Sequence, residues 1–333
     1  MKKITLQVGG NRNVPVQVEE AKTILKRFEQ QLAKAGSTVE EEEDGGGEGT
    51  NQVVVTKIDV SCRQWTAEAI EILKPLLSNV SVNVEIIDMS DIIAGLETSI
   101  GLNIMALFAE TFLPAAFTEG GCLTTLLLND NAMGPRALKV IEPLLKAPKL
   151  QVMYFSNCGL SAETITQLDE GLKKASNDDV AAGGGGGGVA RLSAWNLDRN
   201  MIGLDGAKAV SKLLETCPKM KYFSYCGCRP LSEGTQVIVD GLYAMVNNHP
   251  DHPLEQLRLW DCSIGSGEND DDAIHTLSKM LAKTSHLTHL NLNDAGELGE
   301  AGTALVVQPI LESGCKLVDL NLSTFLYIYV VFT

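Results

Sequence analysis

Residues 123–133 read LTTLLLNDNAM and residues 150–160 read LQVMYFSNCGL, so the pattern LxxLxLxxNxL occurs twice with starts 27 residues apart. Further copies begin at Leu192, Met220, Leu254, Leu287 and Leu317, and weaker copies begin at Val55 and Val84. Seven good copies in one chain are too many for chance matches. The pattern therefore predicts a repeat array, in which the apolar residues of one unit are buried only by stacking on the next unit.

Each motif is followed by a stretch with apolar residues at helical spacing, such as RALKVIEPLLKA at 136–147 and DGAKAVSKLLETC at 205–217. Strand and helix should therefore alternate in an α/β fold. The motif and its period resemble the ribonuclease-inhibitor-like class of leucine-rich repeats. That resemblance implies a horseshoe, a right-handed β-α solenoid with a parallel sheet on the concave face and helices on the convex face.

The ninth residue of the motif is small and polar in five units: Asn131, Cys158, Asn200, Cys228 and Cys262. We expect these side chains to turn inward and hydrogen-bond backbone groups between successive units. Metal or redox chemistry is the weaker interpretation, because Cys226 and Cys228 lack the two-residue gap and the second pair of a zinc site. Cys217 and Cys315 precede strands and are expected in the core.

The charge balance is acidic, with 42 Asp and Glu against 27 Lys and Arg and a net charge of −15. This argues against nucleic acid or an anionic membrane surface as a partner and favours a basic protein surface. The N-terminus lacks the apolar stretch of a secretory signal, and no membrane span of about 20 apolar residues is expected. The sequence thus predicts a cytoplasmic monomer, with the nucleus as an alternative location.

The composition divides the chain into segments: a strand-and-helix cap at 1–36, an acidic Gly-rich linker at 37–52, repeats at 53–323 with a Gly-rich insertion at 176–190, and an apolar tail at 324–333. The insertion is expected to be a flexible surface excursion. The uncharged tail departs from the polar cap that repeat arrays need. A prematurely ended or mis-spliced gene model is the favoured explanation, and a genuine strand that adds to the sheet is the alternative.

The eighth residue of the motif is acidic in Asp91, Asp130, Asp261 and Asp294, with Asn157 and Arg199 between them. Aspartates suit turns and helix caps, which is one interpretation. An acidic rim that attracts a basic partner is the other, with equal weight. The sequence contains no HExxH, GxSxG, Walker or CxxC pattern, so we expect neither a cofactor, nor a metal, nor an enzyme in its own right.

Three stretches resemble the GTPase-activating proteins of Ran, the RanGAP family: IIDMSDIIAGLETSIGLNIMALFAETF at 86–112, LTTLLLNDNAMGPRALKVIEPLL at 123–145 and LQVMYFSNCGLSAETITQL at 150–168. The likeness is specific over about 86–172 and generic elsewhere within 53–323. It implies an activator of nucleocytoplasmic transport, in the cytoplasm or at the nuclear envelope, that grips GTP-bound Ran with the turns at one edge and positions Ran's own glutamine. It also implies contact or scaffold roles for Asp91, Asp130, Asn131, Asn157 and Arg199, with a scaffold role favoured for Asn131.

One position departs from the family. Where the family has an arginine after Ala-Gly, this sequence has Leu96, which can supply neither guanidinium hydrogen bonds nor a charge. The departure predicts impaired activation, with Arg63 and Arg136 as the nearest basic groups that could substitute. The alternative function is a non-catalytic leucine-rich-repeat scaffold of the ribonuclease-inhibitor type.

Overall fold

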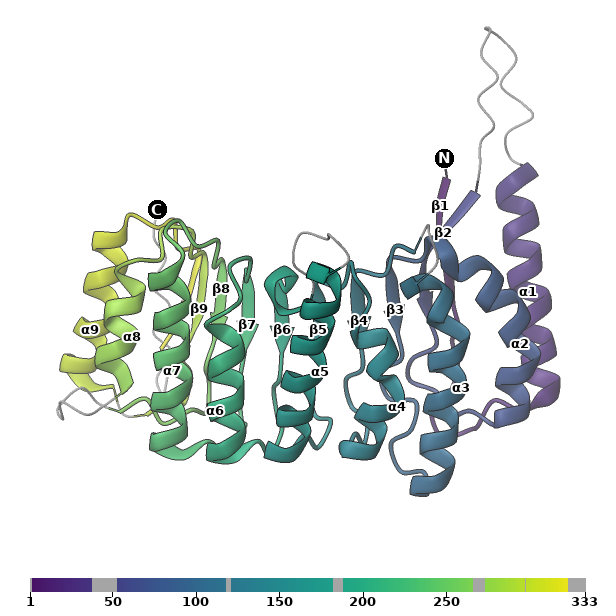
Figure 1. Cartoon of the computed structure of the whole chain (residues 1–333), viewed down its shortest axis with the longest axis horizontal. Helices are drawn as coiled ribbons and strands as arrows, with labels where there is room; N and C mark the ends of the chain where they lie inside the picture. Colours follow the sequence, from purple (N-terminus) through teal and green to yellow (C-terminus); the bar gives the residue numbers. More distant parts are fainter. Residues whose placement is uncertain are drawn as a thin grey trace, which may run out of the picture. The chain divides into compact units, whose positions relative to one another are not determined.

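The computed structural model describes residues 2–37, 53–117, 121–181, 188–265, 273–296 and 298–322, with backbone alone at 173–181 and 188–189. It divides into two compact units. The N-terminal unit comprises Met1–Ala132 and Lys139–Leu150, and the C-terminal unit comprises Met133–Leu138 and Gln151–Thr333. Strands and helices alternate through both units (Figure 1).

The N-terminal unit contains β1 (Lys2–Gln7), α1 (Val18–Ser37), β2 (Val53–Asp59), α2 (Ala67–Val80), the 3-10 helix η1 (Ser81–Asn83), β3 (Ile86–Asp88), α3 (Thr98–Phe117) and β4 (Thr125–Leu127). Helix α4 (Pro135–Leu145) belongs in part to each unit. The C-terminal unit contains β5 (Val152–Tyr154), α5 (Ala162–Ala181), the 3-10 helix η2 (Gly188–Arg191), β6 (Ala194–Asn196), α6 (Gly203–Leu214), β7 (Tyr222–Ser224), α7 (Leu231–Asn248), β8 (Gln256–Arg258), α8 (Ala273–Leu281), β9 (His289–Asn291), α9 (Gly299–Ser313) and β10 (Asp319–Asn321).

Within each unit the strands pair in parallel and in chain order. The register places the same motif position side by side, as in Ile58 with Ile87 and Ile87 with Leu126. The C-terminal unit repeats this with Trp195 beside Phe223. Helices cover one face of the strands in each unit (Figure 1). The predicted α/β leucine-rich-repeat solenoid is therefore confirmed.

The apolar motif positions form the core. In the repeat whose motif begins at Leu123, the first, fourth, sixth and last motif positions are at most 1% exposed: Leu123, Leu126, Leu128 and Met133. Each fully buried leucine of this kind contributes about 1.5–3 kcal/mol. A single repeat offers these side chains nothing to pack against, so the stacking of successive repeats provides their burial.

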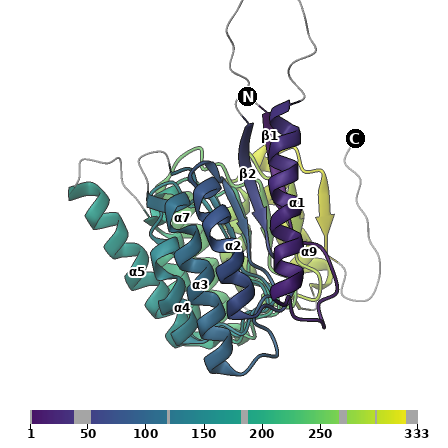
Figure 2. The same ribbon diagram turned by 90° about the vertical axis from the view of Figure 1, so that its right-hand side faces the viewer.

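The N-terminal segment adds a strand and a helix before the first motif. Strand β1 pairs in parallel with β2, with Leu6 opposite Ile58, and α1 lies beside α2 (Figure 2). Helix α5 extends to Ala181, so the first residues of the predicted insertion at 176–190 are helical. Most of the linker at 37–52 and the tail at 324–333 lie outside the described residues.

Helix α3 is an exception to the prediction that the chain holds no stretch of membrane-spanning length. This 20-residue helix contains an 18-residue window with a mean hydropathy of 1.6, so by length and composition it could cross a membrane. Half of that window is buried within the protein. Phe108 packs edge-on against Trp65 at 5.2 Å between ring centroids, which is the environment of a core helix.

Three helices of the C-terminal unit begin at a residue with positive φ: Gly203 at 61°, Leu231 at 56° and Gly299 at 53°. Glycine adopts this conformation freely, whereas a side chain in the left-handed region costs about 1–2 kcal/mol. The Leu231 side chain is 76% exposed, so burial offsets little of that cost.

We therefore expect Leu231→Gly to raise the free energy of unfolding by about 0.5–1 kcal/mol in urea denaturation, since part of the gain is lost to glycine's larger unfolded-state entropy. Leu231→Ala is the matched control, because it removes the same exposed side chain but keeps the left-handed strain. A glycine variant no more stable than the alanine variant would contradict the prediction.

Candidate functional site

The eighth motif residue of eight successive repeats has φ between 51° and 62°. We call this set the post-strand rim: Cys62, Asp91, Asp130, Asn157, Arg199, Gly227, Asp261 and Asp294. The rim backbone continues the strand pairing, because the N–H of Asp91 donates to Asn129 O at 2.8 Å and that of Arg199 to Cys226 O at 2.7 Å. Asn and Asp tolerate the left-handed region better than most residues. The turn interpretation of these residues is therefore confirmed for the backbone.

The rim residues differ in exposure. Asn157, Arg199, Asp261 and Asp294 are exposed in the C-terminal unit, and Asp130 is half-buried in the N-terminal unit. Asp91 is only 9% exposed. Asp91 is thus the one aspartate of the four that solvent scarcely reaches.

The Asp91 carboxylate is held by an arginine that sequence reasoning missed. Arg12 Nε lies 2.6 Å from Asp91 Oδ2, whereas the buried Oδ1 has no hydrogen-bond partner. Burial raises the pKa of Asp91, Arg12 lowers it in part, and the nearby Asp130 carboxylate raises it further. The charge of Asp91 is therefore costly to bury and is compensated from one side only.

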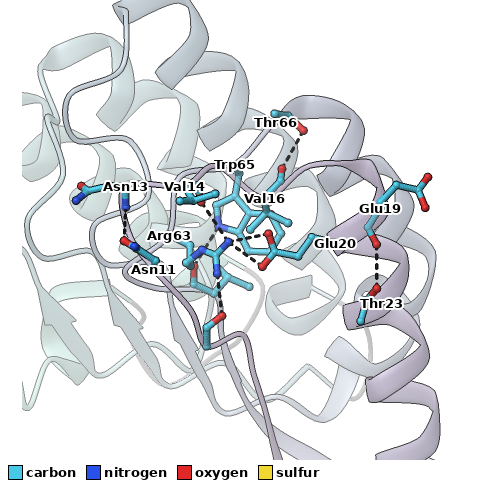
Figure 3. Close-up of polar contacts among 12 residues, drawn as sticks. Asn11, Asn13, Val14, Val16, Glu19, Glu20, Thr23, Arg63, Trp65 and Thr66 are labelled. Atoms are coloured by element: carbon cyan, nitrogen blue, oxygen red, sulfur yellow. Dashed lines mark hydrogen bonds and ion pairs between the residues drawn. The ribbon is translucent and has the colours of Figure 1, made fainter.

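Arg12 lies in a loop that Arg63 holds in place. Figure 3 shows the bonds of Arg63 to Val14 and Glu20. Arg63 is 3% exposed, and its guanidinium donates to Gly9 O at 3.0 Å, to Val14 O at 3.2 Å and to both carboxylate oxygens of Glu20 at 2.8 and 2.9 Å. Arg63 occupies the ninth motif position, where other units carry Asn or Cys. The hypothesis that Arg63 could replace an arginine at position 96 is wrong, because its charged group is buried and already bonded. Arg136, by contrast, is exposed on α4.

Asn131 forms a buried ladder in the N-terminal unit. Its Oδ1 accepts from the backbone N–H groups of Ile92 and Ile93 at 3.0 and 3.2 Å, and its Nδ2 donates to Met89 O and Leu128 O, both at 2.8 Å. The side chain is 1% exposed. The predicted inward orientation is confirmed, and any influence of Asn131 on a partner would pass through the turn that it holds.

The cysteines at the ninth position are also buried and also bond backbone carbonyls. The bonds of Cys228 and Cys262 reach the preceding repeat, whereas the bond of Cys158 to Ser156 O lies within its own repeat. Sγ donates to a backbone carbonyl in Cys158 (Ser156 O, 3.4 Å), Cys228 (Leu197 O, 3.0 Å) and Cys262 (Tyr225 O, 3.1 Å). Burial raises the pKa of the Cys228 and Cys262 thiols, and it raises that of Cys226 to about 12. These thiols are held neutral. Cys217 is buried as predicted, whereas Cys315 is only half-buried.

Leu96 stands on a tight turn of the N-terminal unit. Its N–H donates to Ile93 O at 3.1 Å, and Gly95 between them has φ of 79°, a conformation that glycine adopts at no steric cost. The Leu96 side chain is half-buried. A longer side chain at this position can therefore extend into solvent without displacing the core.

The predicted site residues fall into two groups. Asp91, Leu96, Asp130 and Asn131 belong to the N-terminal unit, whereas Asn157 and Arg199 belong to the C-terminal unit. Arg199 Nη2 reaches Ser156 Oγ at 3.3 Å, next to Asn157 in the chain, so these two rim residues adjoin. Within the described ranges, no group of three or more His, Cys, Asp or Glu could hold a metal ion.

Known proteins resemble this chain over limited stretches. RAN GTPase-activating protein 2 of Arabidopsis thaliana is 29% identical over 100 residues, 30% of this chain and 17% of that protein. A Ran GTPase-activating protein of Drosophila melanogaster is 39% identical over 61 residues, 17% of this chain and 10% of that protein. A ribonuclease inhibitor of Mus musculus is 25% identical over 232 residues, 64% of this chain and 48% of that protein.

The chain thus spans less than half of the length of each of these relatives. No family profile matches it. Among solved structures, an internalin of Listeria monocytogenes covers 90% of this chain and 92% of its own, at 11% identity and a TM-score of 0.27, which is too weak to support any argument. The relatives support a leucine-rich-repeat protein.

Proposed function

We propose that this protein binds a Ran-type GTPase through the post-strand rim and the Leu96 turn, and that it regulates the GTPase without being an enzyme itself. The observation that carries the proposal is that two of the relatives are Ran GTPase-activating proteins. On this proposal the protein acts in nucleocytoplasmic transport, in the cytoplasm or at the nuclear envelope. Its net charge of −15 favours encounter with a basic protein surface.

The exposure of each residue suggests its role in the proposed interface. Asp130, Leu96, Asn157 and Arg199 have accessible side chains and are proposed contacts. Asn131 is a proposed scaffold, since all of its recorded bonds go to backbone groups of its own unit.

Leu96 limits what the interface can do. An activator of this kind must orient the partner's own catalytic groups through polar contacts that form in the transition state. A leucine offers no donor at that point. We therefore propose that the protein binds the GTPase but activates it weakly.

The experiment is phosphate release from GTP-loaded Ran with and without the purified protein. Leu96→Arg is expected to increase the stimulated rate by about 10-fold or more, because a lost transition-state donor commonly costs 10²–10³ in rate. Ile100→Arg is the matched control, because Ile100 is 48% exposed in the same unit. The substitution adds the same positive charge at a position other than 96. Equal rates for the two arginine variants would exclude a specific role for position 96, and absence of Ran binding in all forms would refute the proposal.

A non-catalytic scaffold of the ribonuclease-inhibitor type is the second candidate, favoured by the match to a ribonuclease inhibitor over 64% of this chain. It predicts no Ran binding but inhibition of a ribonuclease. Residual ribonuclease activity at increasing protein concentration tests it directly, and full activity at saturating protein would exclude this candidate.

A further inference from the structure

Arg12 has an exposed side chain at the rim of the N-terminal unit. Among the residues that the structure describes, Arg12 is engaged through Nε alone, in the 2.6 Å contact with Asp91 Oδ2, and its side chain is 53% exposed. A guanidinium has five N–H donors in a planar fork, so an Nε contact leaves the four hydrogens of the terminal nitrogens. That terminal edge has the geometry for bidentate binding of a carboxylate or phosphate.

The backbone under Arg12 is fixed. Arg63 binds the carbonyls of Gly9 and Val14, which precede and follow Arg12 in the chain. Asn11 closes the turn, because its side chain accepts from Asn13 N at 3.0 Å and its carbonyl accepts from Val14 N at 3.2 Å. A side chain on such a loop loses less conformational entropy on binding than one on a free segment.

Asp91 is placed to orient Arg12 rather than to touch a partner. Its carboxylate is nine-tenths buried and its Oδ1 is inaccessible and unbonded. The left-handed turn alone would accept an asparagine equally well, without the cost of burying a charge. The charge is explained by the cation that it holds.

We propose that Arg12 is a binding residue of the interface and that Asp91 is its positioning residue. The inference rests on the proposed function, because it takes the rim to be the surface that meets the GTPase. The group recognised is an anionic oxygen group on the partner, either a carboxylate of the protein or a phosphate of its bound nucleotide. This chain has a net charge of −15 and should meet a basic surface of the partner. The exposed guanidinium of Arg12 would then select a single anionic group on that surface.

If Asp91 rather than Arg12 contacted the partner, the expected change in affinity on removal of Arg12 would have the opposite sign. If Asp91 were the receptor for a cationic side chain of the partner, Arg12 would be an internal competitor. Removing Arg12 would then tighten binding. The sign of a single affinity change therefore separates the two arrangements.

The test is titration of fluorescently labelled Ran, loaded with a non-hydrolysable GTP analogue or with GDP, against the full chain. Arg12→Ala is expected to weaken binding by about 10-fold or more, and Arg12→Lys to restore only part of it, since lysine lacks the fork. Lys22→Ala is the matched control, because Lys22 forms only an exposed ion pair with Glu19 on α1 and should leave the affinity unchanged.

Asp91→Asn tests the positioning role separately. It keeps a residue that tolerates the turn and relieves the buried charge, so the melting temperature should not fall while the affinity does. The double variant with Arg12→Ala should bind no more weakly than Arg12→Ala alone, because both act through one contact. A structural role alone would instead lower the melting temperature.

The nucleotide arm identifies the group recognised. An equal loss with both nucleotides indicates a carboxylate of the partner protein, and a loss confined to the GTP analogue indicates the terminal phosphate. If the unaltered chain binds Ran and Arg12→Ala stays within twofold of it or binds more tightly, the inference is overturned and the proposed function stands. If the unaltered chain does not bind Ran, both fail.

Discussion

Asn200→Ala is expected to lower the free energy of unfolding of the C-terminal unit by about 3–5 kcal/mol, the upper range for a single substitution. Asn200 is 1% exposed. Its Oδ1 accepts from Cys158 N and Leu160 N at 3.0 Å each, and its Nδ2 donates to Phe155 O at 2.8 Å and Leu197 O at 2.7 Å. Alanine leaves these backbone groups buried and without partners, and each one costs about 1–3 kcal/mol before relaxation.

Asn200→Cys is the informative comparison, because the protein itself uses cysteine at this motif position. Cys228 donates to Leu197 O in the unit before it, as Asn200 does to Phe155 O, so a cysteine should recover one bond and lose the others. We expect roughly half of the alanine effect. Asn248→Ala on the exposed end of α7 should stay within about 0.5 kcal/mol of the unaltered chain.

The measurement is urea denaturation followed by tryptophan fluorescence, since the buried Trp195 reports on the same unit. A cost below about 1 kcal/mol for Asn200→Ala would mean that water replaces the amide. The structural account of the ladder would then be wrong.

Glu20→Ala is expected to destabilise the N-terminal unit by about 2–4 kcal/mol, more than removal of the arginine that Glu20 binds. The Arg63 side chain is 3% exposed and that of Glu20 is 39% exposed. Without Glu20, a buried cation keeps only two carbonyl oxygens, and its Nε already has no partner. Arg63→Met instead removes the charge and fills much of the same volume, while Glu20 remains partly hydrated, so we expect a cost below about 2 kcal/mol.

Thermal unfolding, followed by the fluorescence of the buried Trp65, would measure whether Glu20→Ala destabilises the protein more than Arg63→Met does. Glu19→Ala is the matched control one residue away, because its ion pair with Lys22 is exposed and worth about 0–1 kcal/mol. Gly10→Ala is an independent test of the Arg63 contacts. The added alanine Cβ would lie 1.6 Å from Arg63 Nη1, and Gly10 has a φ of 136°. If Arg63→Met proved more damaging than Glu20→Ala, the charge would not be the source of the effect.

The rim illustrates how far sequence reasoning reached. The ninth-position ladder of Asn131 and Asn200 was predictable, because its bonds join residues at equivalent positions of neighbouring repeats. The left-handed turn at Asp91 was predictable in kind, since Asp and Asn suit such turns. The sequence also identified Leu96 as a departure, although only the structure shows the glycine turn on which it stands.

The sequence by itself determined the repeat, the alternation of strand and helix, and the inward position of the small polar residues, because these follow from a local pattern that every unit restates. Only the tertiary structure decided that Arg12 meets Asp91 and that Arg63 holds the loop in which Arg12 lies. Those contacts join residues dozens of positions apart through a segment that lies outside the repeat. The path of such a loop depends on packing and buried charge, which no periodic pattern encodes.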